Sequence, residues 1–152
     1  VILQDEGRIH QVGAVEDVFN RPCSPAAARC VGVENLLDGR IVETAGGTAL
    51  IDVGGIRLRA SSPAPMTSED VVVAVRAEGV RLGQPRPADG LANALSGTVA
   101  AVHPEGPLTR ITLADPVALE IFVSPRDRIA PGQTIDIVIP SDAVHLIAAP
   151  TP

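Results

Sequence analysis

The sequence ENLLDGRIVE at residues 34–43 has a counterpart 58 positions later, ANALSGTVAA at residues 92–101. Both contain Asn, a small or aliphatic pair, a polar residue, Gly, a second polar residue and a β-branched residue. A second pair, VRAEGVRL at 75–82 and IPSDAVHL at 139–146, is offset by 64 positions. The sequence is therefore a duplication in which each half runs from an Asn-led strand to a turn and a final strand. A unit of about 55 residues buries little surface alone, so we expect the two copies to pack against each other.

Between these repeated segments, apolar residues recur with the period of two that is typical of strands. In residues 117–123 (VALEIFV) and 134–139 (TIDIVI) every second residue is Val, Leu or Ile and shares one face, and ALIDV, GIRLRA and VVVAV are similar. Gly and Pro pairs separate these runs at hairpin distances. The pattern predicts a mainly all-β fold of small antiparallel barrels in tandem.

The first 33 residues follow a different pattern. VILQDEGRIHQVG predicts a short hairpin that turns at residues 5–7, and Val15, Val18 and Phe19 form an apolar stripe typical of a helix. A second short helix is expected after Ser24 as N-cap and Pro25 at the first helical position.

Composition excludes several classes of function. A formal charge of −6 and only two aromatic residues, Phe19 and Phe122, argue against binding to nucleic acid, including a single-stranded barrel ligand. No apolar run reaches the roughly 18 residues of a spanning helix, so we expect a cytoplasmic protein, and the missing initiator Met suggests a fragment. The two cysteines are expected to be free thiols, and the three histidines are too scattered to predict a metal site.

The chain resembles two parts of ABC importer ATP-binding proteins. Residues 1–33 resemble the end of the ATPase domain, and the remainder looks like the C-terminal TOBE domain, a tandem of OB-like barrels related to the molybdate-binding Mop fold. VAVRAEGVRL is similar to the IRPEDV-L strand of that family, with Ala77 in place of the usual Pro. The likeness to the ATPase end rests on Gly7, Arg8, Ile9, Gln11, Gly13, Glu16, Asp17, Val18, Pro22, Gly32 and Asn35.

The resemblance implies four segments and one function. These are the ATPase end at 1–33, a first barrel half at 34–83, a linker at 84–90 and a second barrel half at 91–152. It implies a regulatory and dimerisation domain of an importer, most similar to the molybdate and tungstate group. The expected partners are a second copy of the chain, permease subunits and a substrate-binding protein, at the inner face of the membrane. The sequence lacks the phosphate-binding loop of ATPases, so we expect no catalysis by this chain, and ATP and Mg²⁺ only in a preceding ATPase domain.

The resemblance also implies an oxyanion site, although the family's pattern is incomplete here. Gly90 and Ala92 replace a Ser and an Arg, Asp127 replaces a Ser, and Pro140 replaces a Lys. Losing two cations and gaining a carboxylate weakens the binding of a dianion, and Arg57, Arg59 and Ser61 could contribute in the first barrel. Two alternatives stay open: a purely structural dimer scaffold for an importer of another substrate, and a free-standing oxyanion-binding Mop protein. The expected oxyanion ligands are Arg76, Asn93, Ser124 and Ser141.

Overall fold

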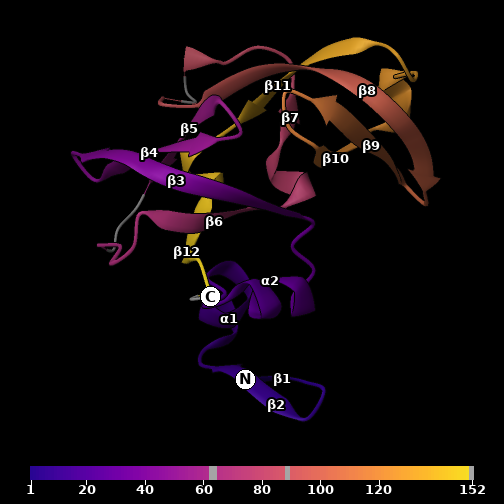
Figure 1. The fold of residues 1–152 in the computed structure, drawn as a ribbon. Coiled ribbons are helices and arrows are strands. Elements are labelled where there is room, and N and C mark those ends of the chain that lie inside the picture. The colour runs from indigo at the N-terminus through magenta and orange to yellow at the C-terminus, as the bar shows by residue number, and fades with distance from the viewer. Residues whose placement is uncertain (62–64, 88–89, 151–152) are drawn as a thin grey trace.

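The computed structural model describes residues 1–61, 65–87 and 90–150 (Figure 1). Within these residues a hairpin and two short helices precede two antiparallel sheets, which confirms the mainly all-β fold. The hairpin strands are β1 (Ile2–Asp5) and β2 (Arg8–Val12), and the helices are α1 (Val15–Asn20) and α2 (Pro25–Cys30). Ser24 caps α2 as expected, because its hydroxyl accepts from the backbone N–H of Ala27 at 3.0 Å.

The first sheet has the strand order β12-β6-β3-β4-β5. Its strands are β3 (Asn35–Ala45), β4 (Thr48–Val53), β5 (Ile56–Ser61), β6 (Asp70–Val75) and β12 (His145–Ala148). The second sheet has the order β10-β9-β8-β11-β7. Its strands are β7 (Arg81–Leu82), β8 (Asn93–Glu105), β9 (Leu108–Asp115), β10 (Leu119–Val123) and β11 (Thr134–Ile139). Within the described residues lie the single-turn 3₁₀ helices η1 (Ala77–Gly79), η3 (Pro125–Asp127) and η4 (Ser141–Ala143).

The two halves of the repeat exchange their last strands. β7 follows the first half in sequence but pairs with β11 of the second sheet, and β12 follows the second half but pairs with β6 of the first. The halves expected at 34–83 and 91–152 therefore each contribute one strand to the other sheet. The expected linker at 84–90 includes residues 88 and 89, which lie outside the described residues.

Two apolar clusters hold these elements together. The larger lies between the two sheets and contains, among others, Ile51, Leu58, Ile111 and Ile121, each with no exposed surface. The smaller joins α1 and α2 to the other face of the first sheet through Val18, Ala28, Val72, Ala74 and Ile147. β6 is therefore buried on both faces, which explains why its sequence is a continuous apolar run rather than an alternating one.

Candidate functional site

The repeated Asn residues lie where the two sheets meet. Asn93, at the start of β8, is 5% exposed, and its side-chain amide donates to the backbone oxygens of Arg59 (2.9 Å) and Ile139 (3.0 Å). Its oxygen accepts from the backbone N–H of Arg59 at 2.6 Å. Because Arg59 lies on β5, this single side chain joins the second sheet to the edge strand of the first.

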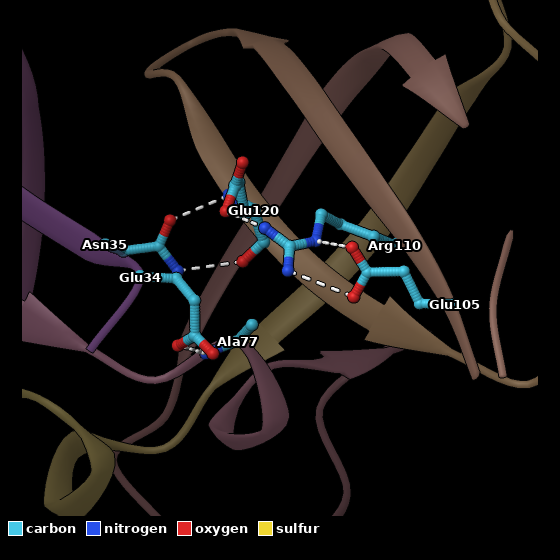
Figure 2. A network of polar contacts seen from close by, with 6 residues as sticks. All are labelled: Glu34, Asn35, Ala77, Glu105, Arg110 and Glu120. Carbon is cyan, nitrogen blue, oxygen red and sulfur yellow. Dashed lines mark hydrogen bonds and ion pairs between the residues drawn. The ribbon is translucent and has the colours of Figure 1, made fainter. Parts of the chain in front are cut away.

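Asn35 makes the equivalent connection at the other junction (Figure 2). It begins β3, its amide donates to the backbone oxygen of Glu120 at 2.8 Å, and its oxygen accepts from the N–H of Glu120 at 2.7 Å. Glu120 lies on β10, the edge strand of the second sheet. The duplicated Asn therefore has a structural role, since each copy bonds to the backbone of the opposite half.

A group of charged residues surrounds the Asn35 junction, and the sequence analysis did not identify it (Figure 2). Arg110 pairs with Glu105 (2.9 Å) and Glu120 (3.1 Å), and its guanidinium carbon lies 5.3 Å from the centre of the Phe122 ring. The hydrogen bond to Glu105 raises the pKa of Arg110. The carboxylate of Glu34 accepts from the backbone N–H of Ala77 at 2.9 Å. At this junction, the N–H of the first residue of η1 is therefore already bonded to a carboxylate of the chain itself.

At the Asn93 junction, hydroxyl groups replace these charged side chains. The Ser141 hydroxyl at the start of η4 lies 3.2 Å from the hydroxyl of Ser61 at the end of β5, and this pair is exposed. Asn93 bonds to the backbone two residues before each member of the Ser pair, so Asn93, Ser61 and Ser141 lie at the same junction.

Arg76 has other partners. Its guanidinium nitrogens donate to the backbone oxygens of Val31 (3.1 Å) and Phe19 (2.7 Å), which lie at the C-terminal ends of α2 and α1. Carbonyl groups at helix ends lack partners within the helix, so a cation is a suitable donor to them. His145 of β12 makes a similar contact, with its Nε2 atom 3.1 Å from the backbone oxygen of Pro22.

These contacts border a cleft of about 270 Å³ between the helical segment and the turns η1 and η4. Its lining includes apolar groups from Phe19 and Pro22 and two carboxylates, Glu78 and Asp142. Arg76 also lines it, but the nearby acids and the carbonyl partners make this cleft a poor environment for a dianion.

Ser124 serves as a local cap. Its hydroxyl accepts from the backbone N–H of Arg126 at 3.2 Å, and its own N–H donates to the carboxylate of Asp127 at 3.0 Å, which is a capping box around η3. The structure therefore brings Asn93 and Ser141 together, whereas Ser124 caps η3 and Arg76 bonds to the helical segment.

The structure is similar to that of the cytoplasmic molybdate-binding protein ModG with molybdate bound, with a TM-score of 0.60 and 23% identity, covering 77% of this chain and 97% of that one. The chain thus has the fold of a Mop-type protein. Residues 73–147 match the TOBE domain family, which confirms the resemblance seen in the sequence.

Its relatives are ATP-binding proteins of ABC importers. The chain is 33% identical to the sn-glycerol-3-phosphate import ATP-binding protein of Rhizobium johnstonii over 99% of its own length and 40% of the relative. It is 29% identical to the spermidine/putrescine import protein of Clostridium novyi over 54% of its length and 22% of the relative. It is 28% identical to the molybdate/tungstate import protein of Pyrococcus abyssi over 78% of its length and 32% of the relative. The chain thus spans less than half the length of these relatives, and the substrates in the names of the relatives differ.

Among the described residues, no helix combines the length and the apolar character needed to cross a bilayer.

Proposed function

We propose that this chain is the C-terminal regulatory part of the ATP-binding subunit of an ABC importer. In this proposal the two sheets communicate with a preceding ATPase domain, which holds ATP and Mg²⁺, through residues 15–31. The supporting observation is that Arg76 of the first half bonds to the ends of both helices in the segment that resembles the end of an ATPase domain. The His145 contact adds a link from the second half to the same segment.

The distribution of exposed apolar side chains also supports the proposal. Within the described residues, the large apolar side chains that are exposed include Val42 and Leu108 on the sheets and Leu91 just before β8, and the others all lie in the first 19 positions. A hairpin that exposes this much apolar surface needs a covering partner, and an ATPase domain preceding it would supply one. The exposed residues of that segment are Val1, Ile2, Ile9, Val12, Val15 and Phe19.

The test compares two changes in the full-length subunit assembled with its membrane partners: removal of residues 34–150, and Arg76→Ala. We expect ATP binding to persist in both variants. We expect both changes to shift the rate of ATP hydrolysis, or the association of the two ATP-binding subunits, in the same direction. Arg126→Ala is the matched control, because Arg126 is exposed and lies on η3, away from the helical segment. If both changes leave hydrolysis and association as in the control, the proposal is wrong.

A second candidate function is the sensing of an intracellular oxyanion at the Asn93 junction. The neighbouring hydroxyls of Ser61 and Ser141 favour it, together with the molybdate/tungstate relative. Calorimetric titration with molybdate, tungstate and sulfate tests it, with light scattering to report dimerisation. Binding that Ser141→Ala weakens and Ser124→Ala does not would support this site. No heat with any of the three anions, but a stable dimer, would favour the purely structural scaffold.

A further inference from the structure

Outside the sheets, the fold brings together three side chains of the kinds that bind transition metals. The ligand atoms of Asp5, His10 and Cys30 all lie within 4.8 Å of one another. They come from three elements: the end of β1, the middle of β2 and the last turn of α2. Within residues 1–61, 65–87 and 90–150, no other group of three or more such side chains is as close together.

The backbone places His10 in an unusual position. In the register of the hairpin, Leu3 pairs with Gln11 and Gln4 pairs with Ile9, so His10 has no partner across the ladder. This is a β-bulge, and a bulge redirects the side chain of the extra residue. Because of it, the imidazole approaches Asp5 on the opposite strand and Cys30 on the helix.

Contacts that do not involve the three ligand side chains hold the hairpin against α2 and against the segment that leads into it. The Gln11 side chain donates to the backbone oxygen of Arg21 (3.1 Å) and accepts from the N–H of Cys23 (2.9 Å). The Cys23 thiol donates to the backbone oxygen of His10 at 3.3 Å. Leu3 packs against the cluster that contains Ala28 of α2. The ligand positions are therefore set by the fold itself, which lowers the cost of ordering them around an ion.

We propose that Asp5, His10 and Cys30 form a binding site for a divalent transition metal, with Zn²⁺ as the ion that fits best. One oxygen, one nitrogen and one sulfur ligand suit zinc, whereas Mg²⁺ and Ca²⁺ require oxygen ligands. A carboxylate, a thiolate and a neutral imidazole also balance the charge of the ion. Tetrahedral zinc with bonds of about 2.0–2.3 Å holds its ligand atoms about 3.3–3.8 Å apart, so small side-chain rotations complete the site. Three protein ligands leave the fourth position for water or for a group from a partner.

A bound ion would connect β1 and β2 to α2. Arg76 already attaches the C-terminal end of α2 to the first sheet. The site would therefore stabilise the segment between the hairpin and the sheets. This inference does not depend on the proposed transport function. The sequence did not predict the site because the histidines are scattered along it and the cysteines were expected to be free thiols, whereas the three ligands come together only in the fold.

The experiment uses the 152-residue chain, reduced and treated with a chelator, and titrates it with Zn²⁺ in competition with a chromophoric chelator. We expect one ion per chain, an affinity reduced at least tenfold in Asp5→Asn, His10→Gln and Cys30→Ser, and added hydrogen-exchange protection in the hairpin and α2. Co²⁺ in place of Zn²⁺ should give the near-ultraviolet charge-transfer band of a thiolate ligand, and Cys30→Ser should abolish it.

His103→Gln is the matched control for affinity, since its side chain does not belong to the three-residue group. Cys23→Ser, which keeps a hydroxyl donor toward the His10 oxygen, is the control for the thiolate band only. Far-ultraviolet circular dichroism checks that every variant is folded. The proposal is overturned if the chain binds no stoichiometric zinc. It is also overturned if the three ligand variants bind as tightly as His103→Gln, or if the cobalt band disappears in Cys23→Ser and persists in Cys30→Ser.

Discussion

At the scale of single residues, the buried side chain of Asn93 makes three hydrogen bonds at the junction of the two sheets. Asn93→Ala removes both amide donors and the acceptor, and leaves the partly buried backbone N–H and oxygen of Arg59 and the buried oxygen of Ile139 without these partners. An unsatisfied buried polar group costs about 1–3 kcal/mol, and each group here carries part of that cost. We therefore expect the free energy of unfolding to fall by about 2–4 kcal/mol. Urea denaturation measures this change. The control Asn20→Ala, at an exposed position of α1, should change stability little, and an equally small effect of Asn93→Ala would contradict the role assigned to it.

His145 gives the chain a pH dependence with a definite sign. Burial lowers the pKa of His145 below its ordinary value, although the contact with the Pro22 carbonyl partly opposes this and the charge of Arg21 adds to it. A lowered pKa means that the unfolded chain binds more protons than the folded chain below about pH 6.5. Stability from this residue is therefore present above about pH 6.5 and is lost as the pH falls through that range. Thermal unfolding between pH 7.5 and 5 should show a steeper loss in the natural chain than in His145→Gln, whereas His103→Gln, at an exposed site, should retain the natural slope.

At the scale of elements, two equivalent glycines allow the long strands to cross their neighbours closely. A Cβ atom at Gly97 would lie 2.5 Å from the backbone oxygen of Asp115 and 3.1 Å from Leu113, and one at Gly39 would lie 2.7 Å from Ile51. Because a backbone oxygen cannot rotate away, we expect Gly97→Ala to destabilise the chain by about 1–3 kcal/mol. Gly13→Ala is the control, since its Cβ would meet Val18 at an ordinary 3.7 Å. Equal stability of the two variants in denaturant titrations would show that β8 and β9 have room to separate.

Local patterns predicted the elements well, but not the partners of the polar residues. The strand at residues 134–139, the N-cap of α2 and both offsets of the repeat are confirmed, because they depend on neighbours in the sequence or on equivalent positions. The long alternating run at 117–123 forms a strand only from Leu119. The sequence marks the two Asn residues as a repeat but does not indicate their acceptors, which lie 34 and 85 positions away. Arg76 was assigned from a family pattern, and its carbonyl partners on the helices have no signature in that pattern.

At the scale of the whole molecule, the exchanged strands make each half dependent on the other. The first sheet needs β12 from the end of the chain, and the second needs β7 from the first half. The Asn residues add bonds from each half to the edge strand of the opposite sheet. Neither half can therefore complete its sheet or cover its apolar face alone, because a unit of this size buries too little surface.

This dependence predicts the behaviour of the chain when it is divided at the expected linker. Residues 1–87 and 90–152, produced separately, should each show little fixed tertiary structure and expose apolar surface to dye binding. When mixed in equal amounts they should recover the circular dichroism spectrum of the intact chain and migrate as a one-to-one complex, because β7 and β12 then regain their sheets. The same mixture with Asn93→Ala in the second fragment should associate more weakly. Two fragments that fold independently, with cooperative unfolding and no gain on mixing, would show that the exchanged strands and the Asn bonds contribute little to the stability of either sheet.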